Sequence, residues 1–219
     1  FAVGRTQELV YALHQLTLER KIPNLPIFVD SPLAVNVTEI FRLHPEYYDE
    51  ETQEFLAHND RQDPFGFSRL RYIREVEDSK ELNFLRDPAV IISASGMCEA
   101  GRILHHLKNN IGDPANTILF VGFQAEHTLG RRLVDGARKV RIYGEEYEVR
   151  ARVERIDGYS AHADREELLG WAQPVIAAGP PHFFLVHGEL EAMQSLAGAL
   201  QQAGATAIDL PERGQSFEL

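Results

Sequence analysis

The sequence has a single cysteine, Cys98, among its 219 residues. One cysteine cannot form a disulfide within the chain, and this scarcity fits a protein of the reducing cytoplasm. Long apolar runs are missing as well. No stretch approaches the roughly 20 residues that a membrane-spanning helix needs, and no signal peptide is visible. We therefore expect a cytoplasmic protein that has no membrane partner.

Basic residues are in the minority, with 22 Lys and Arg against 33 Asp and Glu and a formal net charge of −11 at pH 7. This balance argues against a surface coated with basic residues, although a local basic stripe or a bound metal can still dominate the field at one site. The densest basic stretch can follow a phosphate backbone or form a solvated face that balances the acids. It consists of Arg131, Arg132, Arg138, Lys139 and Arg141.

Internal repeats and low-complexity tracts are also absent, and no methionine stands at the start. The chain opens on Phe1 directly before a helix-like segment, so we expect the natural chain to begin earlier. Its length suffices for one large domain or two small ones. An apolar content of 44% is ordinary for a globular protein.

Apolar runs alternate with helix-like segments in the first part of the chain. Residues 27–30, 89–95 and 117–122 read as buried strands. Ser31 and Pro32 predict a helix start, with serine as the N-cap and proline at the first helical position. Apolar strands separated by helices are typical of a parallel sheet covered by helices. We therefore predict an α/β fold.

The pattern changes near residue 140. Residues 139–143 and 147–156, joined by 144–146, alternate in polarity and predict a β-hairpin. A helix, a strand and a second helix are expected after it. We place a domain boundary here, which gives domains 1–140 and 141–219.

His162 lies just before the predicted start of a helix over about 164–176. Asp164 and Glu167 fit a capping box, so Asp164 has a structural explanation. Phosphate binds well at a helix N-terminus. His162 can donate a proton to a leaving oxygen there, and Ser160 can donate a hydrogen bond to a phosphate.

His187 follows an apolar strand predicted over 182–186, and Gly188 permits a tight turn before a helix over 189–203. A neutral imidazole at the end of a strand can bind zinc. The alternative is a ring that only hydrogen-bonds a loop, and one histidine by itself is not a metal site.

The turn after the strand at 89–95 contains Ser95 and Gly96. Serine and glycine permit close backbone approach and offer hydrogen-bond donors to an anion, although an ordinary strand-to-helix loop would have the same composition. Asp30 ends the first strand and is either catalytic or part of a helix start. Packing or exposure suffices to explain His105 and His106.

Taken together, these segments resemble the β-CASP branch of the metallo-β-lactamase superfamily, the RNA-processing nucleases related to the endonuclease subunit of the cleavage and polyadenylation specificity factor. The resemblance covers essentially the whole chain, and the order of its motifs is more specific than any single motif. The motifs are Gly4-Arg5-Thr-Gln-Glu-Leu9, Val29-Asp-Ser-Pro-Leu-Ala34, Ile92-Ser-Ala-Ser-Gly-Met97 with Gly101-Arg102, Val121-Gly-Phe-Gln124 with Thr128-Leu-Gly130, Ser160-Ala-His-Ala-Asp164 and Val186-His-Gly-Glu189.

The resemblance implies a role for each candidate residue. His162 matches a signature histidine near the scissile phosphate, a candidate general acid, and His187 matches a zinc ligand. Residues 1–140 match the β-CASP cap domain. Residues 141–219 match the returning C-terminal part of the αββα metallo-β-lactamase domain. The residues expected to contact phosphate or RNA are Ser160, Ser95, Gly96, Arg5 and Arg102.

The main zinc-binding motif of this family, His-x-His-x-Asp-His, does not occur in the sequence. The resemblance therefore implies a zinc-dependent ribonuclease that acts on single-stranded RNA when joined to its N-terminal metallo-β-lactamase segment. Two zinc ions in the intact enzyme would lower the pKa of a bridging water. We expect this part alone to hold little zinc and to show no strong nuclease activity.

Three alternatives stay open at the level of sequence. The chain can be a catalytically incomplete module that binds RNA or another protein, or part of a DNA-directed nuclease of the same branch. It can also belong to a small-molecule hydrolase on the same scaffold. A cap of this size suits a polymer better than a small substrate, which argues against the last alternative.

Overall fold

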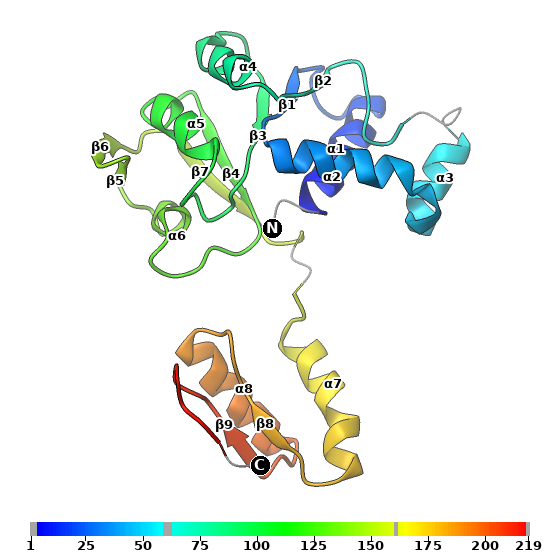
Figure 1. Ribbon diagram of the computed structural model, residues 1–219, viewed down its shortest axis with the longest axis vertical. Helices are drawn as coiled ribbons and strands as arrows, with labels where there is room; N and C mark the ends of the chain where they lie inside the picture. Colours follow the sequence, from blue (N-terminus) through cyan, green and yellow to red (C-terminus); the bar gives the residue numbers. More distant parts are fainter. Residues whose placement is uncertain (1–3, 59–62, 160–161, 218–219) are drawn as a thin grey trace. The chain divides into compact units, whose positions relative to one another are not determined.

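The computed structural model describes residues 4–58, 63–159 and 162–217. The chain forms two compact units, Phe1–Ser160 and Ala161–Leu219, which we call the first and the second unit. Figure 1 labels the helices and strands of both. No helix within the described ranges is long and apolar enough to cross a membrane.

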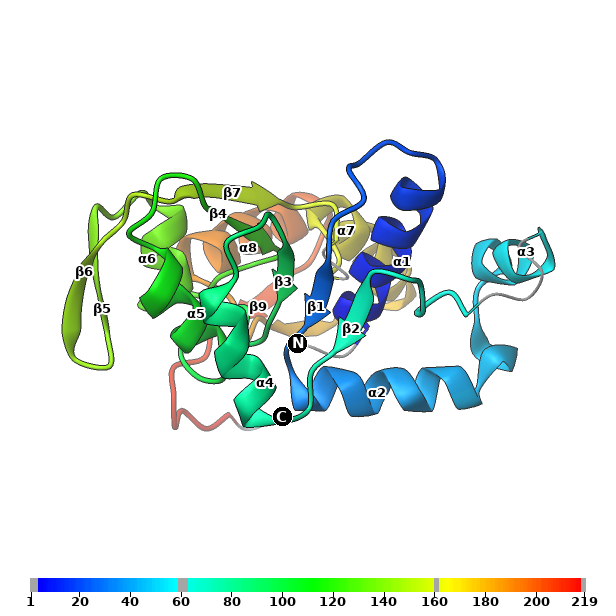
Figure 2. The same cartoon turned by 90° about the horizontal axis from the view of Figure 1, so that it is seen from above.

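A three-stranded parallel sheet forms the centre of one half of the first unit. Strand β1 (Ile27–Val29) lies between β2 (Leu70–Tyr72) and β3 (Val90–Ile92), as Figure 2 shows. Phe28 is in register with Arg71 on one side and Ile91 on the other. Because β1 is the middle strand, all three of its residues are buried. The predicted strands at 27–30 and 89–95 are confirmed in shorter form.

Successive residues of β1 point to opposite faces of the sheet, and all three are apolar and buried. Both faces of the sheet are therefore covered by helices. Val29 packs with Val10 and Val35 in one cluster, and Phe28 packs with Ile73 and Leu82 in another. The Val29 side is covered by α1 (Arg5–Leu18) and α2 (Pro32–Leu43), and the Phe28 side by η2 (Leu82–Phe84). The other helices of this half are η1 (Pro45–Tyr47), α3 (Glu50–His58) and α4 (Val76–Glu81), and α3 packs on α1 through Phe55 and Tyr11.

The predicted start of α2 is confirmed. The Ser31 side chain accepts a hydrogen bond from the Ala34 backbone N–H, and Pro32 is the first helical residue. The serine therefore satisfies one of the backbone donors that every helix N-terminus leaves unpaired.

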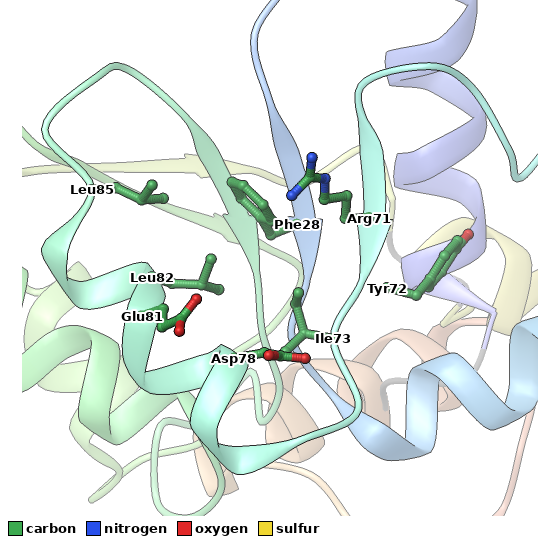
Figure 3. A pocket seen from close by; sticks show the side chains of 8 residues that line it. All are labelled: Phe28, Arg71, Tyr72, Ile73, Asp78, Glu81, Leu82 and Leu85. Carbon is green, nitrogen blue, oxygen red and sulfur yellow. The ribbon is translucent and has the colours of Figure 1, made fainter.

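A cavity of about 500 Å³ lies on the Phe28 side of the sheet, next to α4. Figure 3 shows the apolar side chains of Phe28, Leu82 and Leu85 with charged groups around them. None of the residues predicted to act in catalysis or RNA binding lines this cavity. The complete lining is Phe28, Arg71, Tyr72, Ile73, Asp78, Glu81, Leu82 and Leu85.

The other half of the first unit is built on β4 (Thr117–Val121) and β7 (Arg152–Ile156), which run parallel. Helices α5 (Ile103–Asn110) and α6 (Leu129–Val134) cover them. The apolar core of this half contains Cys98, Leu107, Ile111, Phe120, Leu129, Leu133, Val140 and Ile142.

The predicted hairpin is present but shorter than expected. Strands β5 (Lys139–Ile142) and β6 (Glu145–Glu148) pair antiparallel, and the turn consists of Tyr143 and Gly144 rather than 144–146. Both turn residues have positive φ, at 53° and 83°, which is typical of a two-residue hairpin turn.

The expected second strand over 147–156 is wrong as a single element. The backbone N–H groups of Arg150 and Ala151 both donate to the Ile111 carbonyl, so the chain leaves the hairpin there. Residues after this point form β7 and pair with β4, a long-range pairing that local alternation does not indicate.

The second unit contains α7 (Arg165–Ala178), β8 (His182–Phe184), α8 (Leu190–Gln202) and β9 (Ala207–Asp209). Strands β8 and β9 are parallel, and the core includes Ala172 and Leu200. Both predicted helices are confirmed, and the predicted strand at 182–186 is shorter. The two units divide by contacts at 160/161, and hairpin and β7 belong to the first. The domain boundary proposed at residue 140 stays a prediction.

Candidate functional site

Two loops of the first unit pack against each other where β3 and β4 end. We call residues 93–102 and 121–130 the β3–β4 corner. The Gly130 backbone N–H donates to the Met97 carbonyl at 2.9 Å, and the Ala125 N–H lies 3.2 Å from the Met97 sulfur. A Cβ on Gly130 would lie 2.9 Å from the Gly96 carbonyl oxygen, so glycine is required for this close packing.

The Ser95–Gly96 turn lies at this corner, as the sequence predicted for a strand-to-helix turn. The Ser95 N–H donates to the Ala100 carbonyl, and the Ser95 carbonyl accepts from the Cys98 N–H. Gly96 is exposed, and nothing lies within 4 Å of the position where a side chain would begin. The backbone at Gly96 is therefore open to a ligand.

Arg5 reaches the same corner from the first residue of α1. Its Nη1 atom donates to the Val121 carbonyl at 3.2 Å, and Figure 1 shows the start of α1 beside the end of β4. A Cβ on Gly122 would lie 2.1 Å from the Arg5 Nη1 atom, and Gly122 has φ +120°. Only glycine fits there. The Nε atom of Arg5 is buried and has no hydrogen-bond partner among the described residues.

Two residues of the corner other than glycine have left-handed backbone conformations. Cys98 has φ 56° and His127 has φ 66°. Such conformations cost on the order of 1–3 kcal/mol each and concentrate at ligand sites. Burial raises the pKa of the Cys98 thiol to about 12, so this cysteine is a packing residue and not a nucleophile.

Phe123 and Gln124 also belong to the corner, although nothing in the sequence singled them out beyond the motif that contains them. The Phe123 side chain is 51% exposed. Gln124 is only 4% exposed, and its amide oxygen has no hydrogen-bond partner among the described residues. An unpaired buried carbonyl costs about 1–3 kcal/mol, so a partner from outside the chain would relieve it.

Asp30 lies in a buried network that sequence reasoning missed. It is 0% exposed and accepts hydrogen bonds from Arg102 Nη1 and Ser79 Oγ, both at 2.6 Å. His106 Nε2 lies 2.6 Å from Asp30 Oδ2, the oxygen that also accepts from Ser79, whereas Arg102 binds Oδ1. Burial raises the pKa of Asp30, but hydrogen bonds from His106, Ser79 and Arg102 outweigh it and lower that pKa below its ordinary value.

Arg102 is largely committed within this network. Its Nη1 also donates to the Ile73 carbonyl, and its Nη2 donates to the Arg74 carbonyl at 2.7 Å. Only the remaining Nη2 and Nε hydrogens are left for an anion. His106 is held by Asp30, so packing alone does not account for it, and its Nδ1 atom is buried without a hydrogen-bond partner in the described part of the chain.

His162 lies in the second unit, two residues before the N-cap of α7, and is exposed. The predicted capping box is confirmed, because Asp164 accepts from the Glu167 N–H and Glu167 accepts from the Asp164 N–H, both at 2.9 Å. Asp164 therefore occupies the backbone donor that a phosphate would use. Ser160 lies outside the described residues.

His187 is exposed and follows β8 by three residues, with φ 65°. A Cβ on Gly188 would lie 2.7 Å from the Met193 side chain, so the turn packs closely against α8 and has little room for a larger residue. The described residues contain no group of three or more His, Cys, Asp or Glu side chains that could hold a metal ion. They fit one ligand position and not a complete zinc centre.

A second histidine–carboxylate pair ties β8 to β9. His182 Nε2 lies 2.6 Å from Asp209 Oδ2, and both side chains are about 40% exposed, at 39% and 42%. The His182 ring also packs on Phe184 at 4.2 Å between centroids. The two partners are 27 residues apart, so no sequence spacing predicts the pair.

The basic stretch lies on α6, on β5 and, for Arg138, on the link between them. Arg131 pairs with Asp135 and Lys139 pairs with Glu146, at 2.9 and 2.8 Å. These pairs are exposed and place acids directly beside the bases, which lowers the net positive charge that an RNA backbone would meet.

Two protein-family descriptions match the chain. The "Beta-Casp domain" matches residues 6–133, and the "Zn-dependent metallo-hydrolase RNA specificity domain" matches residues 146–211.

Relatives with curated names match most of the chain. Ribonuclease TTHA0252 of Thermus thermophilus is 39% identical over 204 residues, which are 93% of this chain and 45% of the relative. The transcription termination factor FttA of Thermococcus kodakarensis is 32% identical over 223 residues, or 100% of this chain and 34% of the relative. FttA of Methanosarcina mazei is 30% identical over 205 residues, or 91% and 32%. The chain thus spans less than half of the length of each.

Proposed function

Because the chain belongs to the β-CASP family, we propose that it is the C-terminal portion of a zinc-dependent ribonuclease. The observation that carries this proposal is the similarity to a named ribonuclease over nearly the whole chain. The match of residues 146–211 to an RNA specificity domain supports RNA as the polymer that is cut. The remaining zinc ligands would come from an N-terminal metallo-β-lactamase segment.

The β3–β4 corner is the proposed contact for the RNA backbone. Gly96 offers exposed backbone, and Ser95 lies beside it. Arg5 brings a cation to the same loops through its contact with Gly122. Backbone donors next to a guanidinium are suited to a phosphate oxygen. Arg102 would contribute only the hydrogens that Asp30 and the two carbonyls leave unused.

His162 is the proposed general acid. An exposed imidazole can give a proton to the oxygen that leaves the scissile phosphate. Because Asp164 already caps α7, the phosphate would be held by His162 and Ser160 rather than by the end of the helix. The proposed role of Ser160 rests on the family resemblance alone.

His187 is proposed as one zinc ligand. Its imidazole is exposed at the end of a strand, in a turn that Gly188 fixes against α8. When bound, zinc would supply Lewis acidity and an activated water. The number of ions in the intact enzyme, two by resemblance, is part of the proposal.

The test uses the natural full-length protein with His162→Ala, His187→Ala and the exposed control His58→Ala. His162→Ala should slow cleavage of a single-stranded oligoribonucleotide by about 10²- to 10⁴-fold with unchanged zinc content. His187→Ala should lower the zinc content measured by atomic emission. His58→Ala should change neither. Normal turnover in both active-site variants would overturn the assignment, and faster cleavage of the matching single-stranded DNA would make the enzyme a DNA nuclease.

A further inference from the structure

An exposed phenylalanine is common on protein surfaces, so the exposure of Phe123 is informative only through its surroundings. Phe123 follows Gly122, which the Arg5 guanidinium touches, and precedes the buried Gln124. The Ser95–Gly96 turn lies in the adjoining loop of the corner. Phe84 is even more exposed, at 82%, but lies on η2, outside the corner.

The corner also contains two buried polar atoms of opposite character that lack partners in the described structure. Arg5 Nε is a donor and Gln124 Oε1 is an acceptor. Each costs free energy unless something outside the chain or a water satisfies it. Together with the left-handed Cys98 and His127, they make the corner a candidate ligand site.

We propose that Phe123 is a stacking platform for one unpaired base of single-stranded RNA, next to the backbone and guanidinium groups that hold a phosphate. This proposal rests on the proposed ribonuclease function and adds a residue that recognises the base rather than the phosphate. Every base has a flat π-face, so an exposed aromatic ring binds RNA without regard to sequence.

The neighbours of Phe123 favour RNA over a protein partner. Large contiguous apolar patches are the surfaces that mark protein docking sites. Phe123 is instead flanked by Gly122, Gln124 and, slightly further along, the exposed Glu126 and His127. One aromatic ring among backbone and polar groups is typical of a nucleotide contact.

The test measures binding of a single-stranded oligoribonucleotide that carries one 2-aminopurine, in the full-length protein with His162→Ala to prevent cleavage. Phe123→Ala should weaken binding by about 5- to 150-fold, the range expected for loss of one stacked base. It should also abolish the quenching of 2-aminopurine fluorescence. Phe123→Trp should retain both binding and quenching, and the control Phe84→Ala should behave as the parent.

Phe123→Leu separates stacking from apolar packing, because leucine keeps the bulk and loses the π-face. It should bind as weakly as the alanine variant. Parent-like binding by Phe123→Leu or Phe123→Ala would overturn the proposal, and in the leucine case would favour a protein-facing apolar contact. If Arg5→Ala weakens binding and Phe123→Ala does not, the corner holds phosphate without stacking a base, and the proposal is overturned. If the full-length protein binds no RNA with His162 either intact or replaced, the ribonuclease proposal itself fails.

Discussion

Two histidine–carboxylate pairs in this chain have the same nitrogen–oxygen distance, but one pair is buried and the other is exposed. His106 lies 2.6 Å from Asp30, and His182 lies 2.6 Å from Asp209. The first pair is 7% and 0% exposed, whereas the second is 39% and 42% exposed. Distance alone therefore says little about what such a pair contributes. Burial, and the number of hydrogen bonds that accompany it, decide the effect.

The two pairs also differ in how much of the chain they connect. Asp30 follows β1 and binds Ser79 of α4, Arg102 at the N-cap of α5 and His106 within α5, which are 49, 72 and 76 residues away. The hydroxyl of Ser93, the residue after β3, also donates to the Asp30 carbonyl. Asp209 and His182 only connect two strands that already pair. The buried network around Asp30 connects distant segments of the first unit, whereas the exposed pair of His182 and Asp209 lies on two strands that are already joined.

The largest expected effect is that of Asp30→Ala. Removing the carboxylate leaves Arg102 and His106 buried without their acceptor, and breaking a buried pair in this way costs about 3–5 kcal/mol. Urea unfolding followed by circular dichroism would measure the loss in the free energy of unfolding. Asp30→Asn keeps the shape and should lose less. A loss below about 1 kcal/mol for the alanine variant would show that the network contributes little.

A smaller effect is expected from pH. Arg102, His106 and Ser79 stabilise the ionised form of Asp30 and lower its pKa below the ordinary 3.8. A lowered pKa in the folded state means that the stabilisation is complete above the unfolded value and is lost as pH falls through the folded value. The difference in unfolding free energy between the parent and Asp30→Asn should thus be constant near neutral pH and shrink below about pH 4. A difference that stays constant down to pH 2 would contradict this assignment.

The smallest effect is expected for Asp209→Asn. Exposed ion pairs contribute roughly 0–1 kcal/mol, and salt screens them. The variant should unfold within about 0.5 kcal/mol of the parent in the same urea titration, and added salt should reduce even this difference. A loss as large as that of Asp30→Ala would break the comparison between the two pairs.

Local features could be predicted because their causes lie within a few residues. Ser31 caps α2 through Ala34, and Asp164 and Glu167 form their capping box across a single turn. The strands at 27–30 and 117–122 follow from apolar composition. The position of His187 after β8 could be predicted for the same reason.

Long-range contacts could not be predicted from spacing. Asp30 looked like part of a helix start, and only the folded chain brings it to Arg102 and His106. The end of β6 was misplaced because β7 pairs with β4, more than 30 residues away along the chain. Nothing next to Phe123 and Gln124 in the sequence marks them as functional. Phe123 is a candidate because its ring is exposed, and Gln124 because its buried amide oxygen has no partner among the described residues.

The network around Asp30 has a consequence for how the protein is made. Its carboxylate leaves the ribosome 76 residues before His106 does. At about 5–20 residues per second, this is a wait of roughly 4–15 s during which the acid has none of its α5 partners. In a nascent chain that ends before α5, the Asp30 carboxylate must stay hydrated. Strand β1, which precedes Asp30, therefore cannot yet be buried as it is in the folded protein. The order of synthesis thus delays closure of the first unit until α5 has been made.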